Sequence, residues 1–122
     1  MRHSLVNVIV ACDDGDFTFH LIIDDQGNPT KMRIGGWWGK PDSNDVQPFI
    51  LKPDGRMDFG VYPDDEIEDH QPESRYGTTD LLQRQVFLGR EISIRVDDDD
   101  YYLKVTSLEE ILGSGPKARL PA

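Results

Sequence analysis

Polar and apolar residues alternate most regularly along residues 91–106, EISIRVDDDDYYLKVT. A two-residue turn at Asp98 and Asp99 places Val96 opposite Tyr101, and the next pairs on that face are apolar as well. The pairs on the opposite face are polar or charged. Such alternation is typical of an antiparallel hairpin that covers a core with one face and meets water with the other. The segment therefore predicts a hairpin in this register.

A second hairpin is predicted where residues 17–24, FTFHLIID, put large apolar side chains at every other position. Residues 24–29, DDQGNP, are turn formers, and residues 30–34, TKMRI, resume the alternation. Pairing Ile23 with Thr30 makes the apolar faces of the two segments coincide. We therefore expect residues 30–34 to form the second strand of this hairpin.

A third hairpin is predicted around residues 53–55, Pro-Asp-Gly, which suit a three-residue loop. Proline presets the first turn position, and glycine supplies the positive φ that closes the loop. Pairing Lys52 with Arg56 sets residues 47–52 against residues 56–62, with the apolar side chains of both on one face.

The segments around these hairpins predict one more strand, two loops and two short helical pieces. Residues 5–12, LVNVIVAC, are β-branched and apolar, which predicts an N-terminal strand. The glycines and proline of residues 35–45 indicate a long exposed connection, and the acidic residues 63–75 indicate a solvated loop. Residues 78–85 have helix-capping residues ahead of two leucines, and residues 107–112 resemble a capping box. We expect one or two helical turns in residues 78–85 and a short terminal turn in residues 107–112.

These elements predict a mainly β fold: a single-domain antiparallel small barrel or sandwich of about seven strands, made of the N-terminal strand and three hairpins. One short helix is expected near residues 78–85. Residues 1–112 form the expected domain, and residues 113–122 a flexible C-terminal tail. The pattern leaves the choice between barrel and sandwich open.

Charge narrows the range of partners. The 122 residues carry a formal net charge of −10. Nucleic acids and anionic membranes bind basic surfaces, so neither is an expected partner. A basic protein partner fits this charge, although acidity that serves only solubility is the alternative. The single Cys12 has no internal disulfide partner, and the chain shows no apolar leader or long apolar run, which together predict a soluble, cytoplasmic protein.

The acidic turns are the first candidates for a metal site. Residues 97–100 form a run of four aspartates, and Asp13, Asp14 and Asp16 could add oxygen ligands for Ca²⁺ if the two loops converge. The spacing lacks the ligand ladder and distal glutamate of an EF-hand loop. Ordinary solvated turns are the simpler interpretation, and we expect no metal ion and no cofactor.

Catalytic candidates are few. Among the neutral-pH titrating side chains Cys12, His3, His20 and His70, only Cys12 with His20 suggests a nucleophile and base. A cysteine at the end of an apolar strand is usually a small buried hydrophobe. The carboxylates of residues 64–69 look fully hydrated, unlike a general acid in an apolar pocket. We therefore name no catalytic residue.

The tandem tryptophans Trp37 and Trp38 are the best recognition candidates. Adjacent residues of an extended segment point opposite ways, so one indole can anchor the core while the other lies at the surface. The alternative is that both pack across the end of the barrel. Gly36, Lys40 and His20 complete the candidate binding site.

The leading functional hypothesis is a non-enzymatic protein-interaction module. Its partner is either another protein or a second copy of this chain in a homodimer. It would use the aromatic segment as an anchor and the acidic loops for electrostatic steering. The alternative is a small-ligand-binding protein or enzyme with a pocket at the barrel mouth near Trp37 and Trp38.

Overall fold

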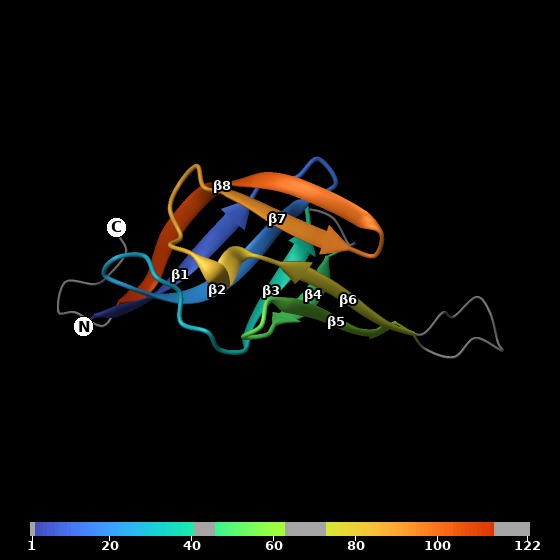
Figure 1. The fold of residues 1–122 in the computed structure, drawn as a ribbon, viewed down its shortest axis with the longest axis horizontal. Coiled ribbons are helices and arrows are strands. Elements are labelled where there is room, and N and C mark those ends of the chain that lie inside the picture. The colour runs from blue at the N-terminus through green and yellow to red at the C-terminus, as the bar shows by residue number, and fades with distance from the viewer. Residues whose placement is uncertain (1, 41–45, 63–72, 114–122) are drawn as a thin grey trace.

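The protein is a closed antiparallel β-barrel of eight strands, each paired with the next and the last paired with the first (Figure 1). The computed structural model describes residues 2–40, 46–62 and 73–113. It confirms the mainly β fold and decides for the barrel, with one strand more than the seven expected. The elements are β1 (His3–Val10), β2 (Asp16–Asp24), β3 (Ile34–Gly39), β4 (Gln47–Leu51), β5 (Arg56–Tyr62), β6 (Glu73–Thr79), η1 (Leu81–Gln83), β7 (Glu91–Val96) and β8 (Asp99–Gly113).

Side chains fill the barrel because alternate residues of each strand point inward. On β2 the inward row is the predicted one, and Phe17, Phe19 and Leu21 are all nearly inaccessible to solvent. An eight-stranded barrel has an interior just wide enough for side chains to fill. The buried apolar core consists of Val6, Val8, Val10, Phe17, Phe19, Leu21, Ile23, Trp38, Phe49, Leu51, Met57, Phe59, Leu81, Leu82, Val86, Ile92, Ile94, Val96 and Val105.

Aromatic rings close one end of the barrel, which we call the aromatic end. Phe17 stacks on Trp38 with ring centroids 4.7 Å apart, and Tyr101 meets Trp38 edge-on at 5.8 Å. The indole Nε1 of Trp38 donates to the main-chain oxygen of Gly15 at 2.9 Å. The polar atom of this buried ring is therefore satisfied, as burial of tryptophan requires.

The guanidinium of Arg75 lies over the aromatic end. It lies 5.7 Å from the ring centroid of Trp38 and 5.5 Å from that of Phe59. Its Nη2 pairs with Asp97 at 2.9 Å, and its Nη1 donates to the side chain of Gln47. These contacts join β4, β6 and the turn after β7 above the core.

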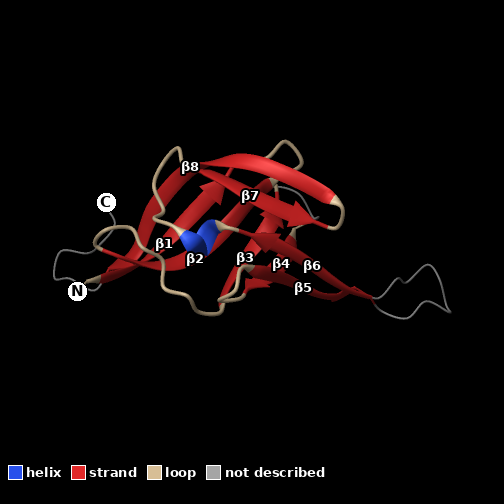
Figure 2. Ribbon diagram, in the orientation of Figure 1, coloured by secondary structure: helices blue, strands red, loops and turns tan. Residues whose placement is uncertain are grey.

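The opposite end is covered by residues 80–90, which we call the strap. Leu81, Leu82 and Val86 point into the barrel and are buried. Val86 also donates its main-chain N–H to Gly27 at 2.8 Å, which ties the strap to the loop after β2. The strap contains the one helix in the described part of the chain, a short 3-10 turn drawn in blue in Figure 2.

Arg90 holds the strap in place from within. The residue is 4% exposed, and its Nη1 and Nη2 donate to the main-chain oxygens of Leu81, Arg84, Gln85 and Asp80 at 2.8–3.0 Å. Burial lowers the pKa of this guanidinium, which nevertheless stays charged because arginine does not deprotonate in proteins. The carbonyls of an irregular segment thus find their donors in one side chain.

The main correction to the predicted elements concerns residues 30–45. The strand lies at Ile34–Gly39, within the segment expected to be an exposed connection, and Phe19 pairs with Gly36 instead of Ile34. A Cβ at Gly36 would lie 2.7 Å from the ring of Phe49, so this glycine serves close packing. Glycines that suggested a loop therefore belong to a tightly packed strand.

The two remaining hairpins are present, one in the predicted register and one shifted. Leu51 pairs with Met57 as expected across the β4–β5 loop. In the β7–β8 hairpin, Val96 pairs with Asp99 instead of Tyr101, which moves the register by two residues. The turn residue Asp97 has a φ of 56°, a left-handed conformation that aspartate tolerates. A shift of two keeps each side chain on its predicted face, which is why the apolar pattern did not detect it.

The short helix expected near residues 78–85 is confirmed as a single 3-10 turn, whereas the helical turn expected at residues 107–112 is wrong. Residues 78–79 end strand β6, and only Leu81–Gln83 are helical in the expected region. Residues 107–112 continue β8, whose C-terminal half pairs with β1 and closes the barrel. Strand pairing therefore overrode the local capping signal. None of the described helical segments is long and apolar enough to cross a membrane.

Some predictions fall outside the described residues. These are most of the acidic loop, with the carboxylates of residues 64–69 and His70, and nearly all of the C-terminal tail of residues 113–122. They stay predictions.

Candidate functional site

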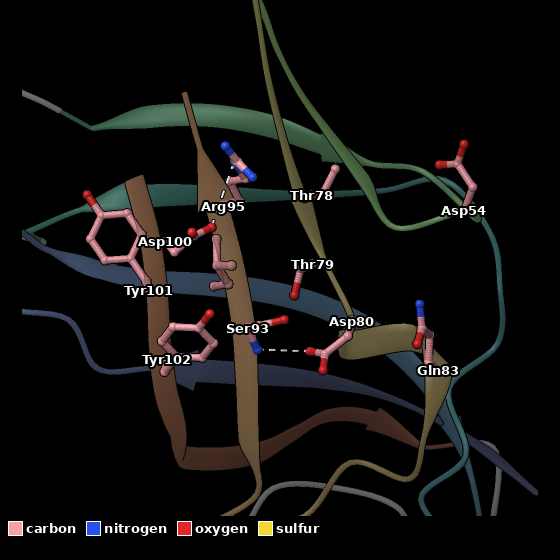
Figure 3. Close-up of a pocket in the computed structure, with 11 residues that line it drawn as sticks. Asp54, Thr78, Thr79, Asp80, Gln83, Ser93, Arg95, Asp100, Tyr101 and Tyr102 are labelled. Carbon is pink, nitrogen blue, oxygen red and sulfur yellow. Dashed lines mark hydrogen bonds and ion pairs between the residues drawn. The ribbon is translucent and has the colours of Figure 1, made fainter. Parts of the chain in front are cut away.

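The outer surface of the barrel carries a polar hollow of about 350 Å³ where β6, β7 and β8 lie side by side (Figure 3). We call it the acidic hollow. The volume is at the lower end of the range typical of ligand sites. It is lined by Asp54, Thr78, Thr79, Asp80, Gln83, Ser93, Ile94, Arg95, Asp100, Tyr101 and Tyr102.

Strand register brings most of these side chains together. Thr78 pairs with Arg95, and Arg95 in turn pairs with Asp100 across the β7–β8 hairpin. One step along the same outer face, Ser93 pairs with Tyr102. Residues directly opposite each other in neighbouring strands point to the same side, so polar outward positions of three strands form one surface.

Asp80 forms the strap side of the acidic hollow. Its Oδ1 accepts the main-chain N–H of Ser93 at 2.9 Å, which fixes the carboxylate against β7. Its Oδ2 lies 3.8 Å from Nη2 of Arg84, whose side chain is 68% exposed. An ion pair this exposed and this long contributes little free energy, so Arg84 does not prevent Asp80 from binding a second cation.

Asp54 borders the hollow from the β4–β5 loop. Hydrogen bonds from the main-chain N–H of Arg56 at 3.0 Å and from its Nε at 2.8 Å lower the pKa of this carboxyl. Asp54 is therefore ionised at neutral pH. With Asp80 and Asp100 it gives the lining three carboxylates. Each carboxylate has an exposed arginine partner: Arg56 lies 2.8 Å from Asp54, Arg84 3.8 Å from Asp80 and Arg95 3.8 Å from Asp100.

Tyr102 adds an aromatic surface to these charges. Its side chain is 80% exposed, and Figure 3 shows the ring beside Ser93, on the β8 side of the hollow. An exposed tyrosine next to carboxylates suits a cation, which gains from the ring face as well as from the negative charge. The hollow thus has the chemistry of a site for an ammonium or guanidinium group.

No family model, curated protein or solved structure matches this chain.

The tryptophans lie elsewhere, and the prediction that they point opposite ways is confirmed. Trp38 is 9% exposed and belongs to the core, whereas Trp37 lies on the outer surface. There the ring of Trp37 meets His20 of β2 edge-on, with centroids 5.2 Å apart. The structure therefore brings Trp37 and His20 together, as the candidate binding site requires.

The other two candidate residues differ in exposure. Gly36 is buried, and a Cβ there would clash with the main-chain oxygen of Thr18. Lys40 follows β3 and is exposed. A role of Trp37, Trp38, Gly36, Lys40 and His20 in binding stays a prediction, and the hollow of Figure 3 is built from other residues.

Cys12 and His20 do not form a catalytic pair. Cys12 packs against the core at the aromatic end, while His20 lies opposite Asn7 on the outer face. Burial and then the charges of neighbouring aspartates, Asp14 first, raise the pKa of the Cys12 thiol. The thiol is therefore protonated at neutral pH and a poor nucleophile.

The acidic turns use their charges locally. Asp16 accepts the main-chain N–H of Cys12 at 3.3 Å, and Asp97 pairs with Arg75. Within residues 2–40, 46–62 and 73–113, no three histidine, cysteine, aspartate or glutamate side chains gather as a metal site would need.

Sequence reasoning missed the acidic hollow because its residues come from four separate segments. Asp100 and Tyr102 were visible as outward positions of the last hairpin. Thr78 and Thr79, which lie beside this hairpin on β6, were not, because residues 73–79 were assigned to a loop and a helix instead of a strand. Assigning that strand would have revealed the row of polar side chains.

Proposed function

We propose that this protein is a non-enzymatic interaction module that binds a basic protein partner through the acidic hollow. The observation that carries the proposal is the hollow itself, which combines three carboxylates with an exposed tyrosine in a concave surface of about 350 Å³. A lysine or arginine side chain of the partner would enter it.

Charge supports this choice of partner. The chain carries a net charge of −10, which attracts basic proteins at long range and speeds their encounter. Within the hollow, Asp80 is held in place by the main chain of β7, so its carboxylate needs little reordering when a cation arrives. We place this function in the cytoplasm, where a single reduced thiol such as Cys12 is the usual state.

The lining supports recognition more than catalysis. Among the described residues of the hollow there is no histidine or cysteine to serve as a general base or nucleophile near neutral pH. Ser93 donates its main-chain N–H to Oδ1 of Asp80, which holds this carboxylate in place. The groups present hold and orient a cation.

The test is an NMR titration of the whole chain with a minimal probe, acetyl-arginine methylamide. We expect saturable shifts of the amide signals of residues 78–80, 93–95 and 100–102. The norleucine analogue, which has no charge, should cause none. The variant Asp100→Asn removes an exposed carboxylate and should weaken binding of the arginine probe on the order of ten-fold.

A matched control separates the hollow from general acidity. Asp98 is exposed on the same hairpin, outside the hollow. Asp98→Asn therefore removes one negative charge, as Asp100→Asn does, without changing the hollow. If Asp98→Asn weakens binding as much as Asp100→Asn, or if the arginine probe shifts all acidic turns alike, the acidic hollow is not the binding site.

A further inference from the structure

A second hollow has the opposite character. It measures about 340 Å³ and is lined by Arg84, Gln85, Phe87 and Arg90, all from the strap. We call it the cationic hollow. No acidic residue is among its described lining residues, although the chain as a whole has a net charge of −10. A local surface of positive charge in so acidic a protein is unexpected if acidity serves only solubility.

The buried guanidinium is the main source of this charge. Arg90 lines the cationic hollow and is 4% exposed. Its Nη atoms donate only to main-chain carbonyls, and its Nε finds no acceptor among the described residues. Carbonyls carry no net charge, and the carboxylate that acts electrostatically on this guanidinium, Asp80, is shared with Arg84. A buried cation with an unused donor favours an anion nearby.

Because Arg90 is buried, the exposed residues Arg84 and Phe87 at the rim of the cationic hollow supply the groups that contact a ligand. The side chain of Arg84 is 68% exposed, and its ion pair with Asp80 spans 3.8 Å, so this weak contact leaves the guanidinium accessible to a ligand. Phe87 is 53% exposed and offers a ring at the surface. The cationic hollow therefore combines an exposed guanidinium, a buried one and an exposed aromatic ring.

We propose that the cationic hollow binds a small monocarboxylate with an apolar body. The carboxylate is held by hydrogen bonds from Arg84, with the buried charge of Arg90 behind it, and the apolar part lies on Phe87. A guanidinium matches the two oxygens of a carboxylate in geometry and in charge. This site is separate from the acidic hollow, and it does not depend on the function proposed above.

The probe for this proposal is phenylacetate, compared with the uncharged phenylacetamide of nearly the same shape. NMR titration of the whole chain should show saturable shifts for amides of residues 84–90 with phenylacetate. Phenylacetamide should bind on the order of ten-fold more weakly or not at all, because it lacks the charge that a guanidinium recognises.

Two variants complete the test. Arg84→Gln removes an exposed guanidinium and should weaken phenylacetate binding on the order of ten-fold, whereas Arg95→Gln, which changes an exposed arginine of the acidic hollow, should not. Equal binding of the amide, an unchanged affinity in Arg84→Gln, or the absence of saturable shifts would each overturn the proposal. The arginine probe of the acidic hollow is read at other amides, so the two proposals stand or fall separately.

Discussion

The two ends of the barrel are closed by different means. At the aromatic end, rings from different strands stack over the core, with Phe17 and Trp38 4.7 Å apart and the cation of Arg75 above them. At the other end, the strap crosses the opening as irregular backbone and is fixed by one buried side chain, Arg90. One closure relies on contacts between side chains, and the other on hydrogen bonds from a side chain to main-chain carbonyls.

The two closures differ in the polar groups that they bury and in the partners that these groups need. Stacked rings contribute by burial of apolar area, and they need no partner except for the indole N–H of Trp38, which Gly15 accepts. Irregular backbone carries polar groups that must be satisfied wherever it is buried. The strap end consequently contains a permanent buried charge, and both hollows are lined in part by its residues.

Removing the central ring should have the largest effect on stability. Trp38→Ala deletes a ring that is 9% exposed and should lower the free energy of unfolding by about 3–5 kcal/mol, as truncation of large core aromatics does. Trp37→Ala, at the neighbouring position on the outer surface, is the matched control and should cost clearly less. Urea unfolding followed by far-UV circular dichroism measures both. Equal losses would mean that Trp38 does not anchor the aromatic end.

The corresponding change at the strap end should be nearly as damaging, for a polar reason. Arg90→Met keeps much of the volume but removes the guanidinium that donates to four main-chain carbonyls. The carbonyl of Asp80 keeps its hydrogen bond from the main-chain N–H of Gln83, and the loss at the others should cost roughly 3 kcal/mol. Arg84→Met changes an exposed arginine of the same strap and should alter stability by about 0.5 kcal/mol or less. Urea unfolding of the two variants provides the comparison. A stable Arg90→Met variant would show that the strap is held mainly by its leucines.

The contrast between the ends also explains which parts of the fold the sequence predicted. Alternating rings and aliphatic residues predicted the inward row of β2 and the β4–β5 hairpin, because a half-buried strand leaves a period of two. The strap has no such period. Its role depends on Arg90, which looks like any charged residue in the sequence, and on contacts such as that between Val86 and Gly27.

The missed strands have a similar cause. Residues 73–79 contain glutamate, arginine, glycine and four hydroxyl side chains, so no run of apolar residues marks them as a strand. The final residues of β8 satisfied a local capping pattern, yet pairing with β1 determines their conformation. The candidate site depends on these same strands, so its residues were visible one by one and their proximity was not.

The glycines of β3 offer a smaller and sharper test of how the aromatic end is packed. Gly36→Ala would place a methyl group 2.7 Å from the ring of Phe49 and against the main chain of Thr18, and should cost about 1–3 kcal/mol through overpacking. Gly35 faces open space, so Gly35→Ala should be neutral or stabilising by up to about 1 kcal/mol. Thermal unfolding of both variants measures the difference. Two equally stable variants would contradict the close packing of β3 on β2.

The smallest expected effect concerns the thiol at the aromatic end. Burial raises the pKa of Cys12, and the charges of Asp14, Asp13 and Asp16 add to the shift. The folded protein therefore holds the thiol proton more tightly than the unfolded chain does. This contribution to stability is fully present below the ordinary thiol pKa of about 8.5 and is lost as the pH rises through the higher value of the folded state.

Reactivity with a disulfide reagent measures this shift directly. At pH 8 the folded protein should react several-fold more slowly than the urea-unfolded chain, since the thiolate is the attacking species. Asp14→Asn removes one of the charges and should raise the rate in the folded state. Asp25→Asn, on the loop at the opposite end, is the control and should not. The strap end holds the charged side chain of Arg90, whereas the aromatic end holds the neutral thiol of Cys12. Equal rates for the folded and the unfolded protein would contradict the raised pKa of Cys12 and with it this difference between the two ends.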